Sequence, residues 1–471
     1  MLFDQISIDI KETTRILLSG ILMIFFSSAY AVNLDTIYSE LPCAVECPAT
    51  VEIPQMTMTI TDFGANGDGT SLCTEAIQTC IDKVAAQGGG HVIVPEGLWL
   101  FTPIQMKSNV DLHLEDNAIM VLTDDKTLFS QEKKSNRCLP GIWAVDAQNI
   151  SITGNGIIDG NGKYWRPVKR GKQSDVEWKR YQEMGGTLSD DGKMWYPYNL
   201  KGHSNITSKG EKEQNLRADL VSFTNCKRIL LKGITVQNSP RFHVHPLFCS
   251  DIVIDGISVR CPWNAQNGDG IDLTNCQRAL VSGCTVDVGD DGICLKGRGG
   301  SSDNVKQPSR DILIQNNKVY HAHGGFVLGS NIIGGMENIV VRHCSYSNTD
   351  TGLRFKSAID RGGKTKNVFV YDIMMNDINN EAITFSCDYE NKQKEGKVCV
   401  PYFQDIHISN IYCTECGTGL YAKGLADYKC VKDITIKDCV INCRKATAVI
   451  DTATADVKYN AADFQVRVSV K

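Results

Sequence analysis

The chain has 471 residues, with 49 lysines and arginines against 54 aspartates and glutamates, and a formal net charge of −5 at pH 7. A charge this close to balance argues against nucleic acid as a partner and leaves ligand recognition to local clusters of charge. The length exceeds that of most single domains, but a repeat protein can grow without dividing its core.

The first 31 residues have the pattern of a signal peptide. An apolar run over residues 16–26 follows Lys11 and Arg15 and ends in Ser28-Ala29-Tyr30-Ala31, a small-residue cleavage pattern. The run is shorter than the roughly 20 residues that a membrane-spanning helix needs. We therefore predict an exported protein, periplasmic or extracellular, without a membrane anchor and with an N-terminal extension over residues 32–58.

Residues 73–86 carry apolar side chains at the spacing of an amphipathic helix, and three glycines at 88–90 end the pattern. The terminal coil of a repeat protein needs a covering element, because its core would otherwise be open to water. We therefore expect this helix to cap the N-terminal end of the fold.

A short β-branched stripe recurs through the rest of the chain. Each copy begins with a polar residue and continues with alternating apolar residues, at intervals of 23–38 residues, and the copies start at Arg228, Asp251, Arg278, Asp311, Asn338, Asn367, Asp405 and Asp433. A propeller would need about four strands per blade and a period of about 40–45 residues. The pattern instead predicts an all-β fold, a right-handed single-stranded parallel β-helix over residues 59–471.

Four polar motifs follow one another at a similar period: NGDGID at 267–272, GDDG at 289–292, HAHGG at 321–325 and RFK at 354–356. Neighbouring strands lie about 4.7–4.9 Å apart, so motifs on successive coils meet on one face. Each motif alone is ordinary, since Asp-Gly pairs are usually turns and an Arg-x-Lys pair is usually a solvated face. Four of them in order on consecutive coils indicate a functional site.

Strand alternation predicts how two of these motifs are oriented. Leu353 and Phe355 should point inward, which places Arg354 and Lys356 together outside. The same alternation would send Asp290 and its neighbour Asp291 to opposite faces. We therefore expect a bend at this point, permitted by the flanking glycines.

The motif series resembles the NTDG, DD, GHG and RIK series of family 28 glycoside hydrolases, the polygalacturonases. The resemblance covers nearly the whole chain after residue 31, including residues 60–70, which are similar to the opening coil of pectin-active β-helix enzymes. Gly268 stands where the family has threonine, and residues 323–326 carry one residue more than the common histidine motif. Both variants resemble those of bacterial exo-acting members.

The resemblance implies inverting hydrolysis of α-1,4 linkages between galacturonate residues, in which an acid protonates the leaving oxygen and a base activates water. It assigns Asp290 as the general acid, and Asp269 and Asp291 as the carboxylates that hold the water. His323 would orient the acid through a hydrogen bond. One carboxyl of such a cluster should keep its proton to higher pH, because like charges repel.

The substrate implied is an anionic pectic polysaccharide, because Arg354 and Lys356 can hold a carboxylate. Further substrate-binding candidates are Asn267, Lys296 and His245, the last from a segment one coil earlier that also contains Arg241 and His243. The scheme needs no metal and no cofactor, and we expect a monomer.

The repeat is interrupted over residues 163–217, a segment rich in Trp, Tyr, Lys and Arg that includes Trp165, Trp178 and Trp195. A long loop without secondary structure is usually functional. Its aromatic faces suit sugar rings and its basic residues suit uronates. Placed just before the catalytic coils, it would close one end of the groove and make the enzyme exo-acting. The segment 387–399 is a second candidate wall.

Among the 19 cysteines, Cys226, Cys249 and Cys276 each precede a predicted strand at a similar offset, which favours stacking inside the coils. Export still permits bridges, and the candidates are Cys43–Cys47, Cys387–Cys399 and Cys413–Cys416.

Four other functions stay open. Rhamnogalacturonan or xylogalacturonan hydrolysis would use the same motifs. A pectate lyase would need Ca²⁺, and a non-catalytic polysaccharide-binding β-helix would not need the aspartates and His323 together.

Overall fold

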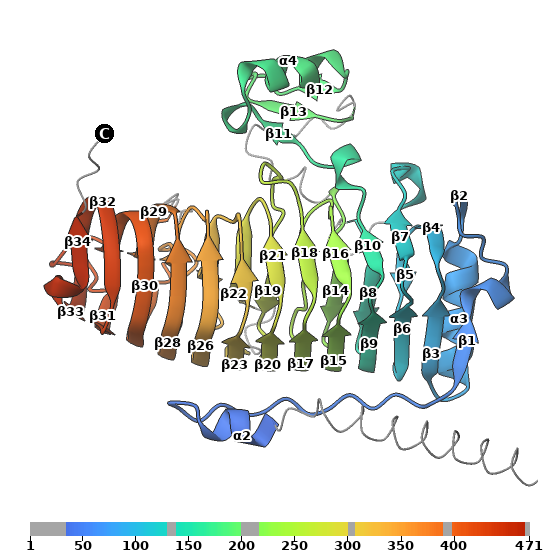
Figure 1. Cartoon of the computed structure of the whole chain (residues 1–471), viewed down its shortest axis with the longest axis horizontal. Coiled ribbons are helices and arrows are strands. Elements are labelled where there is room, and N and C mark those ends of the chain that lie inside the picture. The colour runs from blue at the N-terminus through green and yellow to red at the C-terminus, as the bar shows by residue number, and fades with distance from the viewer. Residues whose placement is uncertain (1–33, 130–137, 199–215, 300–306, 390–397, 467–471) are drawn as a thin grey trace, which may run out of the picture.

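The computed structural model describes residues 34–129, 138–198, 216–299, 307–389 and 398–466. The predicted signal peptide lies outside the described residues. The chain winds into one long solenoid whose strands run parallel from coil to coil (Figure 1), so the predicted parallel β-helix is confirmed. Among the described residues, no helix combines the length and apolar character that crossing a membrane requires.

The strands form three stacks, and each coil contributes to them in turn. The first stack contains β1 (Thr57–Thr59), β3 (Gly90–Val94), β6 (Val110–Leu114), β9 (Gln148–Gly154), β15 (Lys227–Lys232), β17 (Ser250–Asp255), β20 (Gln277–Ser282), β23 (Ser309–Gln315), β26 (Met336–Ser347), β28 (Lys364–Asn376), β30 (Tyr402–Lys423), β31 (Val431–Lys437) and β33 (Ala455–Tyr459).

The second stack contains β2 (Asp68–Leu72), β4 (Gly97–Phe101), β7 (Ala118–Leu122), β10 (Ile157–Asp159), β16 (Thr235–Gln237), β18 (Ser258–Arg260), β21 (Thr285–Asp287) and β24 (Lys318–Val319), and continues through the later parts of β26, β28 and β30 into β32 (Val440–Ile450) and β34 (Phe464–Val466). The third stack contains β5 (Ile104–Gln105), β8 (Ile142–Val145), β14 (Val221–Thr224), β19 (Ile271–Thr274), β22 (Asp291–Gly297), β25 (Gly324–Ile332), β27 (Leu353–Ser357) and β29 (Ile378–Ser386).

The first residue of every repeat lies within the first few residues of a first-stack strand and is here called the corner of its coil. All eight have a left-handed backbone, with φ between 50° and 58°. Asn and Asp adopt this conformation more readily than most residues, which explains why they recur at these positions. The corner side chains also form a ladder: Arg278 Nε donates to Asp251 Oδ1 at 2.7 Å, and Asn367 Nδ2 donates to Asn338 Oδ1 at 2.7 Å.

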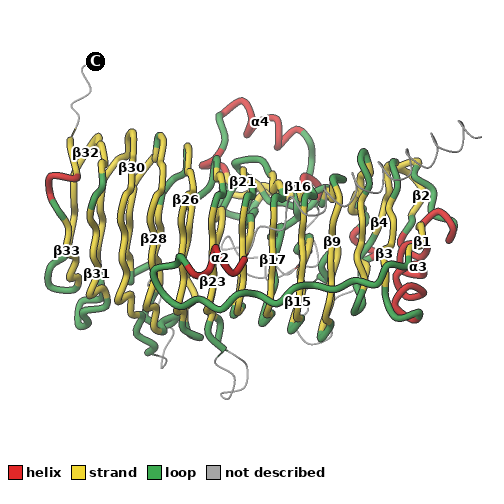
Figure 2. Tube along the Cα trace, turned by 60° about the horizontal axis from the view of Figure 1, so that its bottom comes forward, coloured by secondary structure: helices red, strands yellow, loops and turns green. Residues whose placement is uncertain are grey.

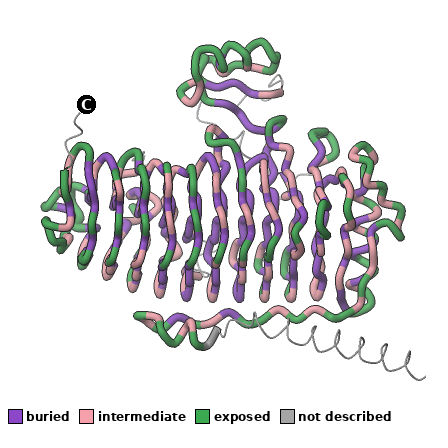
Figure 3. The backbone as a smooth tube through the Cα atoms, viewed as in Figure 1, coloured by how far each residue is buried: buried purple, intermediate pink, exposed green. Residues whose placement is uncertain are grey.

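The interior of the solenoid is filled by the alternating apolar residues of the coils, and Figure 3 shows buried positions interleaved with exposed ones along each turn. Near the C-terminal half the filling is aromatic. Phe355 and Phe385 stack with ring centroids 4.4 Å apart and an interplanar angle of 11°, and Phe403 packs edge-on against both. Phe355 lies between Arg354 and Lys356, so this packing fixes the strand that carries both cations.

Helix α3 (Thr74–Ala86) lies at the N-terminal end of the solenoid (Figure 1) and buries Ile77, Ile81 and Val84 against the core. The extension before it takes a different course. Residues 34–56, here called the strap, include α2 (Leu34–Ser39) and run along the outer face of the first stack (Figure 2). Val45 packs on Leu313 and Val340 there.

The insertion, as far as the structure describes it (residues 162–198), is a folded lobe and not the structureless loop that its sequence suggests. It contains η3 (Gly162–Tyr164), β11 (Val168–Lys169), η4 (Arg170–Lys172), α4 (Asp175–Glu183), β12 (Thr187–Leu188) and β13 (Met194–Tyr196). Its three strands form a small antiparallel sheet that stands above the solenoid (Figure 1).

The expectation that the insertion presents its tryptophans to sugar is wrong for three of them. Trp178 and Trp195 form the lobe's own apolar cluster with Val168, and Trp165 is 1% exposed in the core of the solenoid. Burying these rings is what allows so short a segment to fold. Helix α4 is further stabilised by a capping box between Ser174 and Glu177.

All 19 cysteines lie in the described residues, and each is a free thiol, so none of the three candidate bridges is formed. Cys399 Sγ donates to Gly362 O at 2.8 Å, and the thiol of Cys387 lies beside that of Cys430 instead. The stacking role is confirmed for the cysteines that precede β15, β17 and β20, because these strands pair in register and the three thiols are buried.

Replacing Phe385 with alanine should lower the free energy of unfolding by about 3–5 kcal/mol, because it leaves a cavity beside Phe355 and Phe403. Urea denaturation followed by circular dichroism measures the loss. Met374→Ala is the matched control: its side chain is 60% exposed, and its effect should stay within about 0.5 kcal/mol. Equal effects of the two substitutions would contradict the aromatic core.

Candidate active site

The four polar motifs meet on the third stack, as predicted. Asp291 begins β22 and is in register with Gly324 of β25, next to His323, while Phe326 of β25 is in register with Leu353 of β27. Asp290, Asp291 and His323 each place one side-chain oxygen or nitrogen atom within 4.8 Å of the others. Three adjacent coils thus place one acidic and basic cluster on a single face.

The predicted bend before β22 is present at Gly289 and Asp290. A Cβ atom on Gly289 would lie 2.7 Å from the backbone of Ala265 and of Pro262, so this close approach admits only glycine. The bend turns both aspartates to the same side, and the N–H of Asp291 donates to Asp290 Oδ1 at 3.1 Å.

Asp290 is paired with His323. Nδ1 of the histidine lies 3.1 Å from Asp290 Oδ1, and its backbone N–H donates to Asp290 O at 2.8 Å. The carboxylate is 20% exposed and therefore accessible from the cleft. Burial raises the pKa of Asp290. The hydrogen bond from His323, the charge of that ring when it is protonated, and the charges of Lys356 and Lys172 outweigh burial, so the pKa lies well below its ordinary value.

Asp291 is held by the two cations of β27. Lys356 Nζ donates to Asp291 Oδ2 at 2.7 Å, and Arg354 Nη1 lies 3.4 Å from Oδ1. The inward neighbours Leu353 and Phe355 are fully buried, which confirms the predicted alternation. Burial raises the pKa of Asp291 and the charge of Asp290 raises it further, but Lys356 and Arg354 bring it below its ordinary value.

Asp269 lies in a different environment. Lys296 Nζ donates to its Oδ2 at 2.9 Å and also pairs with Asp272, while Asp269 Oδ1 is buried and has no hydrogen-bond partner among the described residues. Burial raises the pKa of Asp269 well above its ordinary value, and the charges of Asp272, Asp290 and Asp291 add to this against the opposing charge of Lys296. Of the three clustered carboxyls, Asp269 is the one that retains its proton to higher pH.

The remaining substrate-binding candidates separate into two groups. Lys296 is 14% exposed, and Asn267 is half-buried with its Oδ1 accepting from Arg217 at 2.9 Å. His245 is a correction to the sequence-based prediction. It is 1% exposed, with Nδ1 bound to Asp219 at 2.8 Å and Nε2 at 3.2 Å from Thr274, so it does not reach the cleft.

The other two candidates from the same segment are buried as well. Arg241 is 5% exposed and pairs with Asp219 at 3.2 Å. His243 is fully buried, with Nδ1 2.8 Å from Asp269 O, and burial lowers its pKa to about 4. These residues form the floor beneath Asp269, and they act on the site by supporting its backbone.

Gly268, where the resemblance led us to expect threonine, has a steric reason. A Cβ atom at this position would lie 2.8 Å from Cys261 Sγ and 3.0 Å from the Cβ of Ala265. The neighbouring turn, residues 262–265, therefore lies closer to the NGDG segment than a larger residue would allow.

Sequence reasoning missed four residues at the site. Lys172 of the insertion lobe lies 3.3 Å from His323 Nε2, and Asp350 lies 3.8 Å from the same nitrogen. The ring of Tyr389 packs against Arg354 and Lys356, and Trp263 is 56% exposed beside Lys172. No motif marks them, because each comes from a loop whose path the repeat does not determine.

A cavity of about 310 Å³ opens beside His323 and extends over β27, β29 and β30. It is lined by His323, Asp350, Thr351, Arg354, Lys356, Asn380, Glu381, Thr384, Ser386, Tyr389 and Tyr421. Polar groups and two tyrosine rings make up most of this lining, a composition that suits a sugar. Lys172 of the insertion lobe contacts His323 at one end of this lining, and the cavity extends from His323 over the later coils.

Asp290, Asp291 and His323 are the described residues whose side-chain donor atoms lie close enough together to hold a metal ion. Lys356, Arg354 and Lys172 already direct their charges at these three groups. A divalent ion would have to compete with these cations. That no metal takes part stays a prediction.

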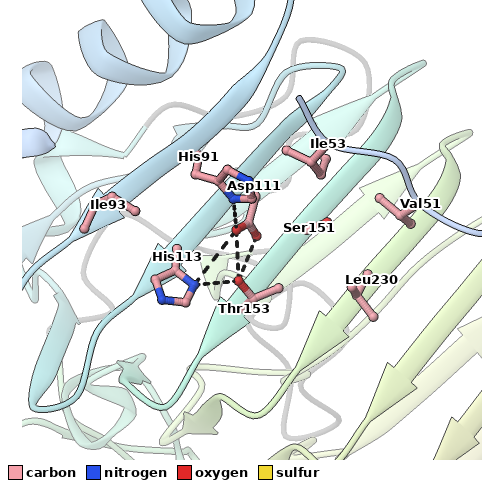
Figure 4. A pocket seen from close by; sticks show the side chains of 9 residues that line it. All are labelled: Val51, Ile53, His91, Ile93, Asp111, His113, Ser151, Thr153 and Leu230. Carbon is pink, nitrogen blue, oxygen red and sulfur yellow. Dashed lines mark hydrogen bonds and ion pairs between the residues drawn. The ribbon is translucent and has the colours of Figure 1, made fainter. Parts of the chain in front are cut away.

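A second cavity, of about 390 Å³, lies beneath the strap (Figure 4). Its polar groups are bound to one another: His91 Nδ1 lies 2.8 Å from Asp111 Oδ2, and Thr153 Oγ1 lies within 3.0 Å of both Asp111 oxygens and 2.8 Å from His113 Nδ1. The cavity is on the first stack and is therefore separate from the acidic cluster.

Comparison with known proteins points to one family. The family described as "Glycosyl hydrolases family 28" matches residues 177–458. Two curated relatives are a probable polygalacturonase of Vitis vinifera, 27% identical over 334 residues, and an exo-poly-alpha-D-galacturonosidase of Dickeya chrysanthemi, 28% identical over 366 residues. These matches cover 67% and 72% of this chain and 60% and 58% of the relatives, so the chain spans about three-fifths of their length.

Among solved structures, an exopolygalacturonase from Thermotoga maritima is similar with a TM-score of 0.70 and 29% sequence identity. The match covers 88% of this chain and 94% of that one. The two chains are thus of similar extent.

Replacing Lys356 with methionine should destabilise the fold in a pH-dependent way. An aspartate with a depressed pKa adds stability above its unfolded pKa of about 3.9, and loses it as the pH falls through the folded value. Without Lys356, burial would raise the pKa of Asp291 instead. The difference in unfolding free energy from wild type should therefore be small at pH 3 and grow towards about 3–5 kcal/mol at pH 7.

Urea denaturation at several pH values measures this difference. Lys356→Met combined with Asp291→Asn is the matched control, because it removes the unpaired carboxylate and should lose most of the pH dependence. A destabilisation of equal size at pH 3 and pH 7 would mean that Asp291 and Lys356 are not electrostatically coupled.

Proposed function

This chain belongs to glycosyl hydrolases family 28, and we propose that it hydrolyses α-1,4 linkages between galacturonate residues of pectin, inverting the anomeric configuration and acting from a chain end. The observation that carries the proposal is the convergence of Asp290, Asp291 and His323 within 4.8 Å, beside a pair of cations. Breaking a glycosidic bond needs a proton donor and a base close together, and this cluster supplies both.

Asp290 is the general acid in this proposal, and Asp269 and Asp291 hold the attacking water. The free protein poses a difficulty, because the pKa of Asp290 is lowered and that of Asp269 is raised. Bound substrate removes this difficulty for Asp290. A uronate held by the more exposed Arg354 brings a negative charge beside the cluster and raises the pKa of Asp290, so the acid gains its proton as the complex forms. Asp291, whose pKa is lowered, is the ionised carboxylate that can accept a proton from the water. Asp290 is also more accessible than Asp269, as a donor to substrate must be.

The cations determine which sugar is bound. Arg354 is 20% exposed and Lys356 is 7% exposed, so the arginine offers its guanidinium to the cleft while the lysine anchors Asp291. A guanidinium binds a carboxylate through two parallel hydrogen bonds. Tyr389 packs against both cations and supplies an aromatic face at the same subsite. The cleft therefore suits an acidic sugar better than a neutral one.

Action from a chain end is supported by the position of the insertion lobe. Lys172 contacts Trp263 O, Gly289 O and His323, so the lobe closes the site on one side, while the cavity opens over the later coils on the other. A groove closed on one side accepts only the end of a chain. The two similar proteins described as exo-acting agree with this proposal.

A xylogalacturonan or rhamnogalacturonan hydrolase is the alternative within the same chemistry. Both would use the acidic cluster, and the products formed from the three polysaccharides distinguish them. The predicted export to the periplasm or cell exterior fits a polymeric substrate that cannot enter a cell.

Asp290→Asn should lower kcat on polygalacturonate by about 10²–10⁴-fold, because it removes the proton donor. Release of reducing ends measures the loss, and circular dichroism checks the fold. Proton NMR of the first product from wild type should show the inverted anomer, with activity unchanged by a metal chelator. Retention of the anomeric configuration, or full activity in Asp290→Asn, would contradict the proposed mechanism. An unsaturated product that absorbs in the ultraviolet would indicate a lyase.

The exo mode predicts that viscosity falls slowly while reducing sugar accumulates. Mono- or digalacturonate should be the first product from polygalacturonate, measured by viscometry and by chromatography of the same samples. A known endo-acting enzyme run in parallel calibrates the two signals. A rapid fall in viscosity at low conversion, with long oligomers appearing first, would show that the lobe leaves the groove open.

A further inference from the structure

Lys172 reaches the catalytic cluster from outside the coils that build it. Its Nζ lies 3.0 Å from Gly289 O, 3.5 Å from Trp263 O and 3.3 Å from His323 Nε2. A lysine ammonium has three donors and no acceptor. Each of its three N–H bonds therefore has one partner here, and Nε2 of His323 must be the acceptor of the third.

This contact determines the protonation state of the imidazole ring. Nε2 accepts from Lys172 and so carries no hydrogen, which leaves the hydrogen of the neutral ring on Nδ1. Nδ1 lies 3.1 Å from Asp290 Oδ1 and donates to it. A second proton on the ring would have to sit on Nε2, where it would remove the acceptor and set two cations 3.3 Å apart.

We propose that Lys172 is a positioning residue that keeps the transferable proton of the Asp290–His323 pair on the carboxyl of Asp290. This inference rests on the proposed function of Asp290 as the acid. Asp290 Oδ1 already accepts from His323 Nδ1 and from the N–H of Asp291 at 3.1 Å, so an arriving proton binds at Oδ2. In the reaction that proton passes from Oδ2 to the glycosidic oxygen, and the electrons of the broken bond remain on the leaving sugar.

Other charged groups face His323, and some of them favour a protonated imidazole while others oppose it. Asp350 Oδ2 lies 3.8 Å from Nε2 and favours a charged imidazole, but its side chain is 46% exposed and is screened by water. Asp290 and Asp291 also favour the charged imidazole. Arg354 and Lys356 of β27 oppose it less directly, because both are paired with Asp291. The charge of Lys172 also lowers the pKa of Asp290, but its ammonium is in direct contact with the imidazole at 3.3 Å. Removing Lys172 therefore favours imidazolium more than it favours a protonated Asp290.

The lobe holds Lys172 in place. Arg170, two residues earlier, donates from Nη1 to Gln173 O at 2.8 Å, pairs with Asp175 and lies over the ring of Trp178, with 5.8 Å from its guanidinium carbon to the ring centroid. Trp178 belongs to the apolar cluster of the lobe. These contacts hold the turn η4 against the apolar cluster of the lobe. The buried tryptophans therefore help to position Lys172.

The first experiment determines which ring nitrogen of His323 carries hydrogen in the free protein. Nitrogen-15 NMR of protein labelled at histidine, recorded at one fixed pH for all variants, should show His323 as a neutral ring protonated at Nδ1, with the resonance assigned by its loss in His323→Gln. In Lys172→Met the ring should become doubly protonated. Lys169→Met changes an exposed lysine of the same lobe and should leave the spectrum as in wild type.

The second experiment measures kinetics on polygalacturonate. Lys172→Met should lower kcat by more than tenfold but by less than the 10²–10⁴-fold expected when the acid itself is removed. KM should change little, and the alkaline limb of the pH profile should move to higher pH. Lys172→Gln keeps an N–H donor without the charge and should restore most of kcat. Lys172→Met should add no loss in a His323→Gln background.

The outcomes separate the inference from the function on which it rests. If wild type hydrolyses polygalacturonate but the NMR spectrum shows hydrogen on Nε2, or the same state in Lys172→Met, the role of Lys172 is wrong. A raised KM with an unchanged pH profile would overturn it in favour of direct substrate binding. If wild type does not hydrolyse polygalacturonate, the proposed function fails, and the NMR result alone decides the protonation state.

Discussion

The coils that the structure describes are hydrogen-bonded to one another as parallel strands with few shifts of register, and the active site depends on that constraint. The cluster has no continuous sequence, because Asp269, Asp290, His323 and Arg354 come from segments that meet only when the coils stack. A shift of one residue would send the outward cations inside, since strand side chains alternate. The left-handed corners prevent such a shift by beginning each repeat at a defined point.

This constraint explains why much of the fold and of the site could be predicted from the sequence. The interval between stripes predicts the length of each coil, and the polar residue at the start of a stripe predicts the position of the corner. The alternation of side chains along a strand predicts that Arg354 and Lys356 point outward. The bend at Gly289 was also predictable, because two adjacent aspartates cannot both face one site on a regular strand. Periodicity indicates these features because they repeat in each coil.

What could not be predicted lies where the repeat stops. The tryptophans of the insertion have no period, so their composition suggested a sugar-binding surface when they form a small core. Lys172 is one of many lysines, and only the path of the lobe brings it to His323. His245 was placed at the cleft because its segment precedes the NGDG motif by one coil. Its direction depends on Asp219 and Thr274, which no pattern links to it.

The strap has a consequence for the order in which the molecule assembles. It is among the first parts of the chain to be synthesised, yet Val45 packs against Leu313 and Val340, which are made much later. Docking must therefore wait until the central coils exist, and until then the outer face of the first stack is uncovered. A chain that emerges from its N-terminal end must therefore stack its coils as far as Val340 before this contact can form. The strap covers only coils that are already stacked.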